Sequence, residues 1–348
     1  MKLKKITEYK LKLKRNITPR NLLIIDDHLY IAFIFDQEGW INSRIVCLDV
    51  ESFEEKWSYD YPFIVNAIQK SPLSDNIISV CMDGIIEEID SVEGVLLESS
   101  SLNVHRCGFS SSIVDSKIVV GGIQGSKLTT CFDLKEADIH WTFDTGGHSY
   151  KPLIAEGKVY QCTENYLRCL DFDSGKLIWQ AYEESTYLFN IEIFQGVVLA
   201  SGHGLINFYS IVDGTLIYQI NTGVPGSEGA IRHIICINEF IYFSDSSGIM
   251  YCYKLLNLAK SFEIDIEVVW TYPSNGAIAS KAEVYKDYLI FAHANKELLV
   301  LDRMTGHLVA SSKLKASAEI SNLLVQENGA MYLAYEKGYV NKFLLKLF

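Results

Sequence analysis

Cysteine thiols are the groups in this sequence with the widest possible chemistry, because a thiolate can bind a metal, form a disulfide or attack an electrophile. The chain has eight cysteines, with no Cys-x-x-Cys and no adjacent pair. That spacing argues against a zinc ribbon and a dithiol redox centre. The basic N-terminus is not followed by an apolar export segment, so we expect reduced thiols. We interpret them as small buried packing groups.

A second set of residues could bind an anion. Five cations stand at or just before the first expected strand of five different segments, and two further polar residues adjoin them: Arg20, Arg106, Lys151, Arg232, Lys281, Tyr150 and His233. If those strands surround a central channel, the cations would meet at its mouth and form an anion or carboxylate site. A shift of one residue in register would turn a side chain to the other face, so unrelated solvated charges are the alternative.

Other catalytic patterns are missing from the sequence. The eight histidines form no His-x-His and no His-Glu-x-x-His motif, and there is no Gly-x-Ser-x-Gly elbow. The glycine clusters do not precede a helical pattern, which argues against a phosphate-binding loop. We therefore expect no catalytic residues, no metal, no cofactor and no enzymatic activity.

The elements that would position these residues come from an internal repeat. Each copy has an apolar strand, an Asp, a short turn that often contains Gly, and a strand that often holds Trp. The copy from Tyr166 through Asp171 and Gly175 to Trp179 is the clearest. Equivalent positions recur every 38 to 48 residues, and they are Asp49, Asp90, Asp133, Asp171, Ser210, Lys254, Asp302 and Leu344. Two more strand candidates precede each anchor. Four short strands per repeat of about 42 residues are typical of a β-propeller blade, as in WD40-like repeats.

The repeat also places the cysteines. Four of them stand two residues before an anchor and two stand nine before: Cys47, Cys131, Cys169, Cys252, and Cys81 and Cys162. Equivalent positions in different blades cannot converge on one metal. We interpret the anchor carboxylates as turn caps and the Trp residues as packing groups between blades.

The two ends of the chain predict how the ring closes. The last repeat has three strand candidates, and the N-terminal strand near residues 6–14 has no partner of its own. Pairing the two would remove a sheet edge. We therefore predict one all-β domain over residues 1–348: an eight-bladed propeller with four-stranded antiparallel blades, its last blade completed by the N-terminal strand. Seven blades are the alternative, because the later copies are irregular.

Charge restricts the class of partner. The sequence has 31 Lys and Arg against 43 Asp and Glu, a net charge of −12, although its first 20 residues carry eight cations and one Glu. An acidic chain is unsuited to nucleic acid. No apolar run is long enough to span a membrane. We expect neither a nucleic acid nor a membrane partner, and favour a basic protein.

The repeat resembles that of the pyrroloquinoline-quinone-type propellers, whose pattern is roughly Leu-Asp-x-x-Thr-Gly-x-x-x-Trp. The best matches are Leu170-Asp171 to Trp179 and Leu301-Asp302 to Gly306. The resemblance implies an eight-bladed propeller. The family's dehydrogenases use an adjacent cysteine pair that this sequence lacks, so the resemblance points to its non-enzymatic branch.

We therefore expect a bacterial, cytoplasmic protein-interaction propeller, in one version an immunity-type protein that neutralises a toxin. One alternative is an assembly scaffold similar to the lipoprotein of the outer-membrane barrel-assembly machinery. The other is a small-ligand or quinone-binding enzyme that uses the channel mouth.

Overall fold

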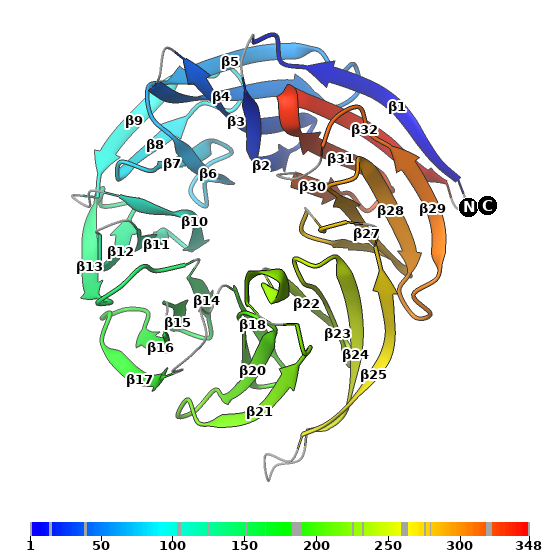
Figure 1. Ribbon diagram of the computed structural model, residues 1–348. Coiled ribbons are helices and arrows are strands. Elements are labelled where there is room, and N and C mark those ends of the chain that lie inside the picture. Colours follow the sequence, from blue (N-terminus) through cyan, green and yellow to red (C-terminus); the bar gives the residue numbers. More distant parts are fainter. Residues whose placement is uncertain are drawn as a thin grey trace.

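Short apolar strands separated by polar turns form eight four-stranded antiparallel sheets, arranged as blades around a central channel (Figure 1). This is a computed structural model, and it describes residues 2–13, 16–37, 40–102, 106–123, 126–150, 152–163, 165–182, 190–224, 226–231, 233–258, 264–274, 276–278, 280–317 and 322–346. No helix in these ranges is long and apolar enough to cross a membrane. The prediction of eight blades is confirmed.

Each blade is named here by its order along the chain, and its strands run from the channel to the rim. Blade 1 holds β2 (Ile17–Ile25), β3 (His28–Gln37), β4 (Trp40–Asp49) and β5 (Glu55–Tyr61). Blade 2 holds β6 (Val65–Lys70), β7 (Ile77–Cys81), β8 (Ile85–Ile89) and β9 (Leu96–Ser101). Blade 3 holds β10 (Cys107–Val114), β11 (Lys117–Gly122), β12 (Leu128–Asp133) and β13 (Asp138–Asp144). Blade 4 holds β14 (Leu153–Ala155), β15 (Lys158–Cys162), β16 (Tyr166–Asp171) and β17 (Leu177–Tyr182).

The second half of the ring repeats this plan. Blade 5 holds β18 (Asn190–Phe194), β19 (Val197–Ser201), β20 (Leu205–Ser210) and β21 (Leu216–Asn221), and the 3₁₀ turn η1 (Gly226–Gly229) follows it. Blade 6 holds β22 (Ile234–Ile237), β23 (Phe240–Ser244), β24 (Ile249–Leu258) and β25 (Ile264–Pro273). Blade 7 holds β26 (Glu283–Tyr285), β27 (Tyr288–His293), β28 (Glu297–Asp302) and β29 (Leu308–Lys313). Blade 8 holds β30 (Asn322–Val325), β31 (Ala330–Tyr335), η2 (Glu336–Gly338) and β32 (Tyr339–Lys346).

The N-terminal strand β1 (Lys2–Lys10) completes blade 8 at the rim, as predicted. It pairs antiparallel with β32 from Lys2 opposite Lys346 to Lys10 opposite Tyr339. The strand starts and ends four residues earlier than expected. The reason is that Leu11, which is 2% exposed, leaves the sheet and enters the core between blades 8 and 1.

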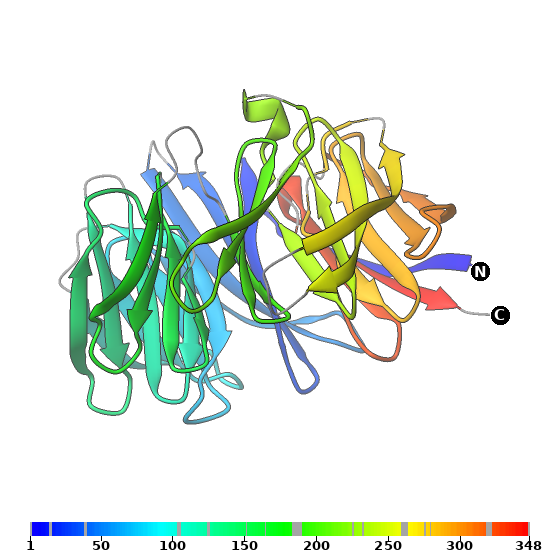
Figure 2. The same cartoon turned by 90° about the horizontal axis from the view of Figure 1, so that it is seen from below.

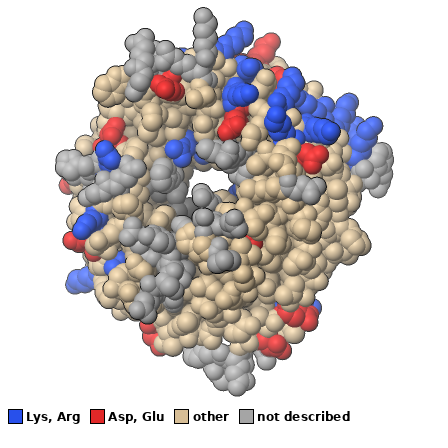
Figure 3. Space-filling model, viewed as in Figure 1, with Lys and Arg blue, Asp and Glu red and all other residues tan. Residues whose placement is uncertain are grey.

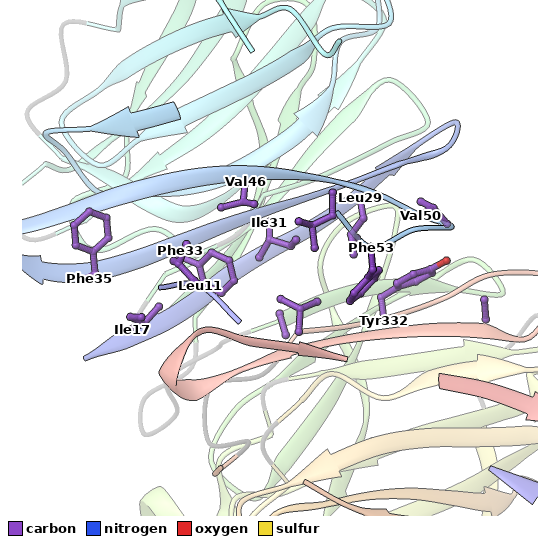
Figure 4. Packing of buried hydrophobic residues seen from close by; sticks show 14 residues of the cluster. Leu11, Ile17, Leu29, Ile31, Phe33, Phe35, Val46, Val50, Phe53 and Tyr332 are labelled. Carbon is purple, nitrogen blue, oxygen red and sulfur yellow. The ribbon is translucent and has the colours of Figure 1, made fainter. Parts of the chain in front are cut away.

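Apolar clusters between neighbouring blades form the core. Figure 4 shows the cluster where the chain ends meet, in which Phe33 of blade 1 lies beside Leu11 and Phe53 of blade 1 lies beside Tyr332 of blade 8. In a meander of four strands, the turns after the first and third strands lie at one end and the turn after the second lies at the other. One face of the disc, here called the hairpin face, therefore consists of those first- and third-strand turns. η1 lies on the opposite face (Figure 2).

The Asp anchors cap the third-strand turns, as the sequence predicts. Asp49 Oδ1 accepts the backbone N–H groups of Glu51 and Ser52 at 3.1 and 2.7 Å. These bonds lower the pKa of the Asp49 carboxyl to about 2. The carboxylates of Asp90, Asp133, Asp171 and Asp302 accept equivalent bonds.

Two of the degenerate anchors differ from this pattern. Lys254 and Leu344 lie inside β24 and β32, because both strands continue past the position where the other blades turn. In blade 5 the Ser210 hydroxyl takes the place of the carboxylate and accepts the Val212 N–H at 3.3 Å.

Four rim tryptophans join a blade to the next one. The Trp179 indole of blade 4 donates from Nε1 to the Ile211 carbonyl of blade 5 at 3.2 Å. A Cβ at Gly214 would lie 2.4 Å from that indole, so this turn requires glycine. The same pairing joins Trp57 to Gly94, Trp141 to Gly175 and Trp270 to Gly306. The structural interpretation of Trp57, Trp141 and Trp179 is confirmed.

Candidate functional site

The cysteines lie in packing positions. Cys47, Cys131, Cys169 and Cys252 each lie directly across the sheet from the rim Trp of the same blade. All four are fully buried, and burial raises their thiol pKa values, for Cys47 to about 12. Such thiols stay protonated and are poor nucleophiles and ligands near neutral pH. Within the described ranges, no group of His, Cys, Asp and Glu has a metal-binding arrangement.

The predicted channel-mouth cations that the structure describes have different environments. Arg106 and Lys281 are exposed and lie one and two residues before β10 and β26, the innermost strands of blades 3 and 7. Arg20 lies inside β2 at a bulge and is half-buried, which lowers its guanidinium pKa. Lys151 and Arg232 lie outside the described residues. The channel is open in Figure 3, and a shared anion site at its mouth stays a prediction.

The two companions of these cations also differ. Tyr150 is half-buried and packs on the apolar cluster between blades 4 and 5, which includes Tyr160 and Trp179. His233 is exposed and directly precedes β22. Tyr150 therefore contributes to the core as well as lying close to an innermost strand.

A row of three polar side chains crosses blade 4, and the sequence pattern does not predict it. Gln161, Arg168 and Gln180 lie side by side on β15, β16 and β17. Arg168 is 7% exposed and donates to Gln180 Oε1 at 3.4 Å and to Thr163 Oγ1 at 3.3 Å. Gln161 is fully buried, and neither of its amide atoms has a hydrogen-bond partner in the described part of the chain. Only the strand register brings these residues together.

The hairpin face is strongly acidic. Its turns carry thirteen exposed carboxylates: Asp26, Asp27, Glu51, Glu54, Asp75, Glu93, Asp115, Glu136, Glu156, Asp173, Asp213, Asp287 and Glu327. The exposed lysines in the same turns are Lys135, Lys176 and Lys286. By contrast, most Lys and Arg side chains visible in Figure 3 lie over β1 at the upper right. The net charge is therefore divided unevenly over the disc.

Blade 2 has the least covered rim strand. Five of the six residues of β9 are exposed, among them Leu96 at 41% and Leu97 at 52%. The turn before β9 adds Val92 at 69% and Val95 at 46%. Between residues 71 and 105 the sequence has seven carboxylates and neither Lys nor Arg. The composition of this segment was available from the sequence, but its exposure on both faces of a rim strand was not.

Comparison with known proteins supports the fold. No family model and no curated protein matches the sequence. BamB from Moraxella catarrhalis matches 100% of this chain and 99% of its own, with a TM-score of 0.73 and 13% identity. Sqt1 from Chaetomium thermophilum, bound to the N-terminus of ribosomal protein L10, matches 99% of this chain and 100% of its own, with a TM-score of 0.80 and 14% identity.

A designed protein has the same architecture. The computationally designed Ika8 protein matches 97% of this chain and 98% of its own, with a TM-score of 0.74 and 12% identity. At such identities the matches establish the propeller fold.

Proposed function

We propose that this protein is a non-enzymatic interaction propeller that binds a basic protein in the cytoplasm. The observation that carries the proposal is the hairpin face, where exposed carboxylates greatly outnumber exposed lysines. Like-signed charges on one face produce a field that accelerates encounter with an oppositely charged partner. The Asp-capped turns hold those charges on a rigid support.

The fold and the thiols agree with this proposal. Sqt1, a propeller of similar architecture, was solved in complex with a segment of another protein. The eight cysteines form no disulfide, and seven of them are buried, which suits a reducing compartment. In the version we favour, the protein is an immunity-type factor that covers the basic surface of a bacterial toxin.

The test is affinity purification at low and high salt with two charge-reversal variants. Glu93→Lys combined with Glu136→Lys alters the hairpin face of blades 2 and 3. Asp265→Lys combined with Glu267→Lys makes the same change in charge on the rim strand β25. We expect the first pair to abolish recovery of a basic partner and the second to leave it unchanged. If both pairs retain the partner equally, the hairpin face does not bind it.

A scaffold for the assembly of β-rich proteins is the second candidate. The match to BamB over the full length of both chains favours it. Cell fractionation separates the two, because the scaffold function requires the protein to be outside the cytoplasm. Recovery in the periplasmic fraction would favour the scaffold.

A further inference from the structure

We propose that blade 2 binds an extended segment of its partner as a fifth strand along β9, and that this segment alternates basic and apolar residues. The inference rests on the proposed function and specifies where the basic partner docks. β9 is the last strand of its sheet, so the backbone groups along its outer edge have no strand partner among the described residues. Such an edge can pair with an added strand.

The position of Glu98 distinguishes this edge from those of the Trp-bearing blades. Glu98 takes the register position that Trp57, Trp141 and Trp179 occupy in their own blades. β9 therefore lacks the indole that fastens a rim strand to the next blade. This leaves both of its faces accessible to solvent.

Charge defines what the edge can bind. Glu98 lies directly opposite Glu88 on β8, and two carboxylates facing each other across a sheet repel. Ser74 and Asn76 donate to Glu88 at 2.7 and 2.8 Å, whereas Glu98 makes no hydrogen bond or ion pair with any described residue. A Lys or Arg on an added strand would supply the missing counter-charge.

Exposed apolar side chains of β9 would also contact the added strand. Leu96 lies opposite Ile89 on β8 and Glu98 lies opposite Glu88, so Leu96 and Glu98 are on opposite faces of blade 2. A partner strand with alternating side chains would place apolar groups beside one face and basic groups beside the other. The acidic edge disfavours pairing with a second β9, because the carboxylates of both copies would meet.

The chain already contains one strand of this chemistry. β1 alternates exposed Lys2 and Lys4 with half-buried Leu3 and adds to the outer side of β32. A basic and apolar strand is thus compatible with the rim of this propeller. β1 itself is paired with β32 in blade 8 and is therefore not the occupant of β9.

The probe is a fluorescent seven-residue peptide that alternates Lys with Val, and the control peptide has Glu in place of Lys. We expect the Lys peptide to bind, the Glu peptide not to bind, and affinity to fall as salt rises. Leu97→Lys should weaken binding at least tenfold. Ile178→Lys is the matched control, since Ile178 is 46% exposed at the equivalent position of β17. Both changes are on the surface, so both proteins should fold.

Hydrogen exchange locates the contact. We expect the bound peptide to slow exchange of the β9 amides selectively. If the Lys peptide or the purified partner binds Leu97→Lys at full affinity, the β9 inference is wrong and the proposed function stands. If no basic partner binds at any salt concentration, the proposed function itself fails. Association of the protein with itself that Leu97→Lys abolishes, seen by sedimentation velocity, would identify a second copy as the occupant and overturn the proposal.

Discussion

Phe53 of blade 1 stacks on Tyr332 of blade 8, with ring centroids 6.3 Å apart and planes 23° from parallel. Phe53 occupies the turn position that glycine holds in blades 2, 4, 5 and 7, and its φ is +64°. Its ring fills the space that a rim Trp would take, since Thr7 stands at the Trp position of blade 8. Lys342 Nζ donates to the Val50 carbonyl at 2.8 Å, in place of an indole N–H. The seam between the chain ends thus takes its aromatic ring from the opposite blade.

Phe53→Gly should destabilise the protein by about 2 kcal/mol or more in urea unfolding. Loss of a buried phenyl ring costs about 3–5 kcal/mol, and relief of the left-handed backbone returns about 1 kcal/mol. The matched control is Ala137→Gly, because Ala137 is exposed and has a φ of +53° at the same position of blade 3. That change should be neutral or slightly stabilising.

Adding Thr7→Trp to Phe53→Gly should restore part of the lost stability. The pair rebuilds the arrangement of the other blades, with an indole against a glycine. Thr7→Trp alone should be destabilising, because Phe53 already fills the space. A double-mutant cycle with no coupling between the two sites would contradict this account of the seam.

Gly175→Ala should cost more stability than Gly157→Ala. The φ of Gly175 is +66° and that of Gly157 is +69°, so both substitutions strain the backbone. A Cβ at Gly175 would lie 2.5 Å from the Trp141 indole, whereas nothing lies within 4 Å of one at Gly157. We expect a difference of about 1–3 kcal/mol in unfolding free energy, as for other overpacked sites. Equal losses would show that the indole moves aside without cost.

Stability should fall as the pH rises from 7 to 10. Burial raises the pKa of Cys131 and Cys252 to about 12, while thiols of the unfolded chain ionise near 8.5. Above that value the unfolded chain loses protons that the folded chain keeps, which favours unfolding by about 2 kcal/mol per thiol at pH 10. Urea midpoints at the two pH values measure the effect.

Cys131→Val separates the thiols from other groups. Buried tyrosines such as Tyr242 also have a raised pKa, and they act in the same direction. The variant should therefore lose part of the pH dependence and keep the rest. An unchanged slope would mean that the Cys131 thiol contributes nothing to it.

Gln161→Leu should stabilise the protein by about 1 kcal/mol. A buried amide with no partner costs about 1–3 kcal/mol per unmet group, and leucine of similar size removes that cost. Gln180→Leu is the matched comparison on the other side of Arg168 and should be destabilising, because it removes the acceptor of the Arg168 Nε–H. A loss of stability in Gln161→Leu would show that an ordered water or ion bridges the row.

The sequence determined the architecture of this protein. Eight copies of one short pattern specify strands and turns through local properties: alternation of apolar residues, Asp-capped turns and glycines of positive φ. The missing fourth strand of the last repeat predicted the pairing of β1 with β32. The tryptophan in blade 6 was harder to find, because the β24–β25 hairpin is longer and places Trp270 sixteen residues after Lys254, against eight in the other blades.

The tertiary structure decided which residues meet between blades and which stay exposed. Strand register places Gln161 beside Arg168, and the neighbouring blade determines what Phe53 packs against and how exposed β9 is. A repeat pattern does not encode either of these. The distribution of charge over the surface also depends on the tertiary structure. The sequence showed an acidic chain with a basic first strand, and only the meander of each blade brought the acidic turns to one face. Distant turns share that face because every blade reverses direction three times, so alternate turns lie at the same end.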